Sequence, residues 1–149
     1  MALIVSGKAL ETRRFQSKNW KDDEHFQLNE FNRAPRPQGM WVRGIVLHTT
    51  HGTSPQPILP GKGNAGGALA NIKYWNSLAN TSHANHKNNY ASAHLLVDRD
   101  ATVIQAADLS EQTWHATSVN PVTIGIEVVQ GSDGSLYEDQ IKSTVAMLS

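Results

Sequence analysis

The sequence Trp41-Val-Arg-Gly-Ile-Val-Leu-His-Thr-Thr50 joins a short, partly β-branched apolar run to a histidine at its end. Its centre, Ile45-Val-Leu47, follows a glycine and precedes a stretch rich in glycine and proline, which predicts a strand buried on both faces. In sheets with helical crossovers, ligands gather at the carboxyl ends of strands. His48 therefore stands where a site would form, although a histidine hydrogen-bonded at a strand end is the simpler interpretation of this residue alone.

The composition predicts one globular domain. The chain has 149 residues, of which 39% are hydrophobic and 17% charged, enough for a single hydrophobic core. Lys+Arg and Asp+Glu number 13 each, so no net charge favours a nucleic-acid partner. Because there is no cysteine, a metal would need His, Asp or Glu ligands, and seven histidines are present. The apolar start Met1–Val5 is too short for a signal peptide, and no run is long enough for a membrane span.

Helical and strand patterns alternate along the chain, which is typical of an α/β domain. Residues 1–40 are predicted to form an irregular arm that docks through its aromatic residues, and 41–149 to form the domain. The Gly52–Gly67 loop is long enough to be functional. The polar loop at 81–89 is expected to bind metal only adventitiously, through His83 and His86. Two helices are predicted, one at Ala65–Asn80 with Trp75 in the core and one from Glu138 to Ser149 with a stripe of Ile141, Val145 and Leu148. Ala93–Val97 and Thr102–Gln105 are predicted to form a hairpin, with Ala101 at a turn position where glycine would be favoured, and Thr123–Val129 a buried strand.

Glu127 is the second residue that points to a site, because it lies inside an otherwise apolar strand. Strand alternation places Glu127 on one face with Thr123, Gly125 and Val129. A carboxylate buried without a partner is costly, so Glu127 belongs either to a protected ion pair or to a site that needs a tuned base. The small Gly125 leaves room on that face for another group to approach, which favours a site.

Two further histidines have weaker signals. His115 follows Trp114 in a predicted loop; it is either a polar surface residue or, with the indole as an apolar wall, part of a cleft. His94 alternates with apolar residues in the first hairpin strand, where structural hydrogen bonding is the more favoured role.

Four motifs occur in the order and approximate spacing of a known family: Ile45-Val-Leu-His-Thr-Thr50, Ser92-Ala-His-Leu-Leu-Val-Asp-Arg-Asp100, Thr113-Trp-His-Ala116 and Asn120-Pro-Val-Thr-Ile-Gly-Ile-Glu127. Together they resemble the zinc-dependent N-acetylmuramoyl-L-alanine amidases, which include the T7-type phage lysozymes and the peptidoglycan recognition proteins. The resemblance runs from Trp41 to the end of the chain. It implies an α/β fold with a mixed central β-sheet flanked by helices and zinc in a surface cleft.

The resemblance also assigns roles to individual residues. His48 matches the first zinc ligand, and Glu127 matches the general base of the bacterial amidase branch. Trp114, His115 and Asn120 match positions near the substrate cleft.

Two departures from the family pattern affect these assignments. The remaining zinc ligands, a histidine and then an aspartate or cysteine, are expected beyond Ser149, so the chain is expected to lack the C-terminal part of the fold. In one branch a tyrosine precedes the hairpin histidine, but here that position is Ala93. A glutamate-assisted mechanism is therefore favoured over a tyrosine-assisted one.

The activity implied is hydrolysis of the amide bond between N-acetylmuramic acid and L-alanine in peptidoglycan or muropeptides. Zn²⁺ would polarise the lactyl carbonyl, Glu127 would pass the water proton to the leaving amine, and His115 or a group further along the chain would stabilise the oxyanion. The alternatives are a peptidoglycan-binding module of the same fold that does not cut, and a different metallohydrolase or a structural domain. The expected absence of a signal peptide fits lysis, dedicated secretion or a cytoplasmic recycling enzyme.

Overall fold

The computed structural model describes residues 28–50, 66–80, 91–131 and 133–148, together with two short paired strands, β1 (Ile4–Val5) and β2 (Lys8–Ala9). The predictions for most of the N-terminal arm, for residues 52–65 of the long loop and for His83 and His86 lie outside the described residues. No helix in the described ranges has both the length and the apolar character needed to cross a membrane.

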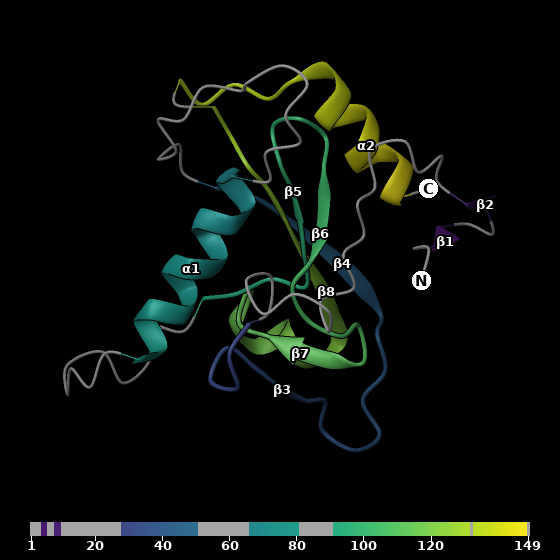
Figure 1. Ribbon diagram of the computed structural model, residues 1–149. Helices are drawn as coiled ribbons and strands as arrows, with labels where there is room; N and C mark the ends of the chain where they lie inside the picture. The colour runs from purple at the N-terminus through teal and green to yellow at the C-terminus, as the bar shows by residue number, and fades with distance from the viewer. Residues whose placement is uncertain are drawn as a thin grey trace.

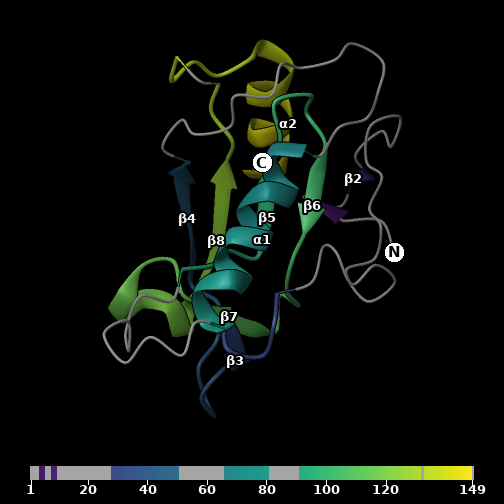
Figure 2. The same cartoon turned by 60° about the vertical axis from the view of Figure 1, so that its left-hand side comes forward.

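A four-stranded mixed sheet forms the centre of the molecule (Figure 1). Its strands lie in the order β4 (Gly44–Thr49), β8 (Thr123–Val128), β5 (Leu95–Val97) and β6 (Val103–Gln105). Both β4 and β5 run parallel to β8, whereas β6 is antiparallel to β5. Helices α1 (Gly66–Asn80) and α2 (Glu138–Leu148) cover opposite faces of this sheet (Figure 2). The predicted α/β class, a mixed sheet flanked by helices, is confirmed.

Each face of the sheet has its own apolar core. On the α1 side, Ile72 and Trp75 pack with Leu96, which confirms the predicted helix and the core position of the tryptophan. On the α2 side, Met147 packs with strand residues that include Ile126. The alternation expected in the 123–129 strand is confirmed, because Ile124, Ile126 and Val128 belong to the α2-side core and Val129 to the α1-side core.

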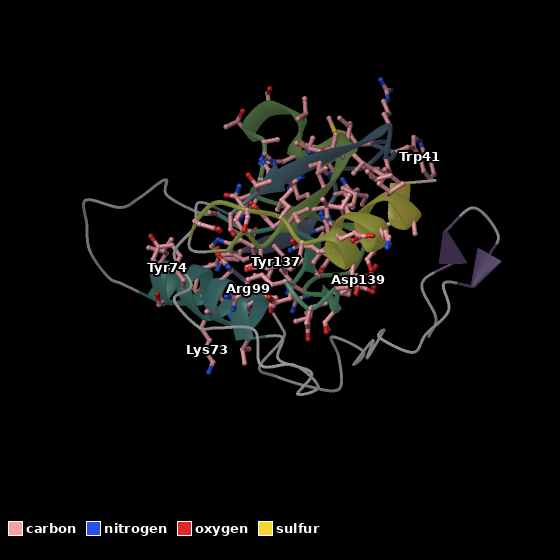
Figure 3. The ribbon with its side chains drawn as sticks, turned by 90° about the horizontal axis from the view of Figure 1, so that it is seen from above. Trp41, Lys73, Tyr74, Arg99, Tyr137 and Asp139 are labelled. Carbon is pink, nitrogen blue, oxygen red and sulfur yellow. The ribbon has the colours of Figure 1, made fainter. Side chains whose placement is uncertain are left out.

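The prediction that the Ile45-Val-Leu47 strand is buried on both faces was wrong. Strand β4 is at the edge of the sheet, and Ile45 and Leu47 are each 47% exposed on the α2 side. Trp41, expected to begin the strand, lies before it and is 76% exposed (Figure 3). A short apolar run indicates a strand, but it does not say how many neighbours that strand has; within the described ranges β4 pairs only with β8.

The apolar stripe expected on the last helix does not form the packed face of α2. The buried residues are Gln140, Thr144 and Met147, whereas Ile141, Val145 and Leu148 are each more than 40% exposed. Gln140 reaches the core because its side-chain amide donates hydrogen bonds to the carbonyls of Val97 (3.0 Å) and Val129 (2.7 Å). Hydrogen bonding to strand ends, rather than hydrophobicity alone, therefore decides which face of this helix is inward.

The hairpin and the end of the arm complete the fold. The predicted hairpin of β5 and β6 is confirmed, and Ala101 in its turn has φ 68°, the left-handed region that favours glycine. Before β4, a short strand β3 (Arg33–Pro35) pairs antiparallel with β7 (Glu111–Thr113), and Leu28 is buried in the α1-side core. Residues 28–35 thus contact the domain through Leu28 and the β3–β7 pairing. Phe31, the one aromatic residue among the described residues of the arm, has a 48% exposed side chain, so these contacts are not the aromatic docking that the sequence predicts.

Candidate active site

His48 and Glu127 lie side by side on one face of the sheet. The parallel pairing of β4 with β8 puts His48 directly opposite Glu127, and paired residues in neighbouring strands project to the same face. This is the α1 face, because Leu96 is the partner of Glu127 in β5 and belongs to the α1-side core. The fold therefore brings together two residues that lie 79 positions apart in the sequence.

His115 joins them from the loop between β7 and β8. Its ring lies edge-on to the rings of His48 and His94, with centroids 5.8 Å apart in each pair. The ring occupies the space above Gly125, where a Cβ would come within 2.5 Å of His115 Cγ. The room that the sequence suggests on this strand face is thus filled by an imidazole of the same chain.

Hydrogen bonds set the orientation of His115. Asn120, buried in the 3-10 helix η2 (Thr117–Val122), accepts through Oδ1 from the backbone N–H groups of His115 (3.0 Å) and Ala116 (2.6 Å). The Thr123 hydroxyl donates to the carbonyl of Val119 (2.8 Å) and lies 3.3 Å from His115 Nε2. Because the single hydroxyl proton of Thr123 is already used, Nε2 must donate to it, and Nδ1 carries a bare lone pair.

His94 is a structural residue of the site. It is fully buried, and its Nδ1 accepts from the backbone N–H of Gly125 (3.0 Å) and from the Thr113 hydroxyl (3.0 Å). Its Nε2 therefore carries the proton and donates to the carbonyl of Glu111 (3.0 Å). Burial lowers the pKa of His94 to about 4, and the hydrogen bond to the Glu111 carbonyl raises it by less. The ring therefore stays neutral at neutral pH. These bonds agree with the structural role favoured from the sequence.

The electrostatics of the other groups suit proton transfer. Burial raises the pKa of Glu127 from its ordinary 4.5 to about 7, so this carboxyl both takes up and releases a proton near neutral pH. Burial, followed by the neighbouring rings of His94 and His48, lowers the pKa of His115 to about 4. His115 therefore offers a neutral acceptor rather than a positive charge.

Three buried polar atoms of the site have no hydrogen-bond partner: His48 Nε2, His115 Nδ1 and Glu127 Oε2. Buried polar atoms are normally paired, so an unpartnered set on one face marks a place for a ligand, a water molecule or a metal. His48 Nε2 fits one ligand position of a zinc ion. A catalytic zinc takes about three protein ligands, and no group of three or more His, Cys, Asp or Glu in the described parts of the chain is arranged to hold a metal.

The remaining predicted site residues are placed as follows. Trp114 is half-buried, with its indole N–H donating to the carbonyl of Phe31 (2.7 Å) and its backbone N–H to Ser92 Oγ (2.8 Å). Asn120 is buried and uses its side-chain oxygen to hold the loop that carries His115. Sequence reasoning missed Thr123 as the partner of His115, and it gave no role to Arg36.

Comparison with known proteins identifies the family. A family model described as Amidase_2, N-acetylmuramoyl-L-alanine amidase, matches residues 38–149. The chain belongs to this family. The resemblance carried by the four sequence motifs is thereby confirmed. No curated protein sequence matches the chain.

Solved structures similar to this chain include a mutant endolysin, the catalytic domain of XlyA and AmpD. A mutant endolysin from Bacillus subtilis is 26% identical with a TM-score of 0.47, covering 74% of this chain and 62% of its own. The catalytic domain of XlyA is 25% identical with a TM-score of 0.43, covering 74% and 65%. AmpD from Citrobacter freundii is 22% identical with a TM-score of 0.41, covering 98% and 75%. The chain thus spans less than two thirds of the length of the first two.

Proposed function

We propose that this chain carries part of the active site of a peptidoglycan amidase that cleaves the bond between N-acetylmuramic acid and L-alanine. The observation that carries the proposal is the pairing of His48 with Glu127 on one sheet face, each with a buried, unpartnered side-chain atom. When bound, zinc supplies a Lewis acid that polarises the lactyl carbonyl and acidifies water. His48 Nε2 would be one of its protein ligands.

Glu127 moves the proton in this reaction. Its carboxylate accepts a proton from the water whose oxygen forms the new bond to the carbonyl carbon. As the C–N bond breaks, the same carboxyl donates that proton to the nitrogen of the departing L-alanine. The raised pKa of Glu127, about 7, supports both roles, because neither the acid nor the base form is strongly disfavoured at neutral pH.

We assign His115 a different role from the stabilisation of the oxyanion that the sequence suggested. Its only N–H donates to Thr123, so the group facing the site is the Nδ1 lone pair, which accepts hydrogen bonds and cannot donate to an oxyanion. In the proposed reaction His115 accepts a hydrogen bond from the substrate or from water, with Trp114 beside it as an apolar wall. The oxyanion donor is then a group outside the His48–His115–Glu127 set.

The test is the Glu127→Ala substitution in the full-length protein. Mass spectrometry measures the stem peptides that are released from muropeptides with a free N-terminal L-alanine. The melting temperature shows whether the variant is folded. Turnover should fall on the order of 10²- to 10⁴-fold, the contribution of a positioned general base, with the fold retained. Glu138→Ala, which removes an exposed carboxylate of α2, is the matched control and should leave turnover unchanged.

Three results would contradict the proposal in different ways. Unchanged turnover in the Glu127→Ala protein would remove the glutamate mechanism. Release of reducing sugar instead of stem peptide would indicate a glycosidase. Tight binding of muropeptides by the zinc-loaded full-length protein without any cleavage would support the binding module instead.

A further inference from the structure

Arg36 lies immediately before the part of the chain that matches the family, and it has an unusual set of partners. Its Nη1 donates to the carbonyls of Asn120 (3.2 Å) and Pro121 (2.8 Å). Its Nη2 donates to the carbonyls of Leu109 (3.3 Å) and Thr123 (3.0 Å). The same nitrogen lies 3.3 Å from His94 Nε2, which already donates to the carbonyl of Glu111. One guanidinium therefore joins four backbone oxygens from the segment after β6, from η2 and from the first residue of β8.

Two of these four carbonyls belong to residues that hold His115. Asn120 binds the backbone of His115 and Ala116, and Thr123 accepts from His115 Nε2. The guanidinium thus fixes the separation between the two supports of the imidazole. A planar fork with five N–H donors suits this role, whereas a lysine ammonium has only three donors on one atom.

The backbone around Arg36 is itself restrained. Proline occupies both flanking positions, 35 and 37, and fixes φ there, while Pro35 is paired with Glu111 in the β3–β7 ladder. In β3, Arg33 forms an ion pair with the Glu111 carboxylate (2.8 Å). The side chain of Arg36 is therefore delivered from a segment that is anchored independently of η2.

A second site residue is held by the same segment. The indole N–H of Trp114 donates to the carbonyl of Phe31, and its backbone N–H donates to Ser92 Oγ, which in turn donates to the carbonyl of Asn32 (2.6 Å). Both Trp114 and His115 are thus positioned by residues 31–36, which precede the matched residues 38–149.

We propose that Arg36 is a positioning residue of the active site, which holds His115 with its Nδ1 lone pair beside His48 by tying η2 to the start of β8. The proposal rests on the proposed function for its catalytic consequence, but its structural part stands without it. Residues 31–36 of the arm would then belong to the active site.

The test compares Arg36→Lys and Arg36→Met with Arg43→Met, a control that removes an exposed arginine just before β4 and leaves the β3–β7 ladder intact. The first readout is the imidazole tautomer of His115, measured by ¹⁵N NMR. The unsubstituted protein and Arg43→Met should show the Nε2–H form. Both Arg36 variants should gain a mixture with the Nδ1–H form, because the Thr123 acceptor is no longer held in place; Arg36→Lys keeps the positive charge, so a change there reports position and not charge.

The second readout is turnover of muropeptides by the full-length protein. A displaced His115 should lower kcat on the order of 10- to 100-fold, with KM changed less than about threefold. Wild-type tautomer in a folded Arg36→Lys protein would overturn the proposal even if Arg36→Met failed to fold. Absence of amide cleavage by the unsubstituted protein would instead refute the proposed function, and the tautomer measurement would still decide the role of Arg36.

Discussion

Replacing Glu127 with glutamine should change how the stability of the chain depends on pH. The carboxyl has a pKa of about 7 in the folded chain against an ordinary 4.5, because burial disfavours its charged form. One pKa unit corresponds to about 1.4 kcal/mol, so the full shift amounts to about 3 kcal/mol, and partial exposure of the group reduces this to about 1–3 kcal/mol. Since the folded pKa is the higher one, the folded state binds the proton more tightly. This stabilisation is complete below pH 4.5 and is lost as the pH rises to 7.

The assay is urea denaturation of the unsubstituted chain and of Glu127→Gln at several pH values from 4.5 to 8, with a chelator present. Glutamine has nearly the same shape as glutamic acid but does not ionise. The variant should therefore not lose stability through this side chain as the pH rises from 4.5 to 7. The free energy of unfolding of Glu127→Gln minus that of the unsubstituted chain should grow by about 1–3 kcal/mol between pH 4.5 and 7 and stay constant above pH 8. Titrating histidines contribute equally to both chains, and Glu138→Gln controls for the change in net charge. A difference that does not vary with pH would show that Glu127 is not desolvated, and the reasoning about its role as a base would fail.

Three other outcomes are expected. Gly125→Ala should destabilise the chain by about 1–3 kcal/mol in urea denaturation and remove the NMR contacts between His115 and His48, because the new Cβ would overlap the His115 ring; retained contacts would contradict the placement of that ring. Gln140→Met should cost about 1–3 kcal/mol by leaving a buried strand carbonyl without its donor, and a neutral effect in denaturation would refute this account of α2. In the Glu127→Gln chain, the free energy of unfolding should fall as the pH drops from 6.5 to 4, since the folded pKa values of His94 and His115 are each about 4 and the unfolded rings take up a proton first; a flat profile in this range would contradict the burial of both rings.

The local patterns in the sequence were sufficient for most elements and for the residues with unusual chemistry. Helical spacing predicted α1, and alternation predicted which residues of β8 face each core. An acid in an apolar strand and a histidine at a strand end marked Glu127 and His48. Local periodicity carries such information because helix and strand geometry determine which neighbours along the chain share a face.

The tertiary structure alone decided how these elements are used. The place of β4 at the sheet edge and the choice of the Gln140 face of α2 depend on contacts between segments far apart in the sequence. The same is true of the tautomer of His115 and the role of Arg36, because each is set by hydrogen bonds that close only when the arm, η2 and β8 meet. Residue type and spacing identify which groups have the necessary chemistry; their protonation, orientation and unpartnered atoms arise from burial, and burial is a property of the packed chain.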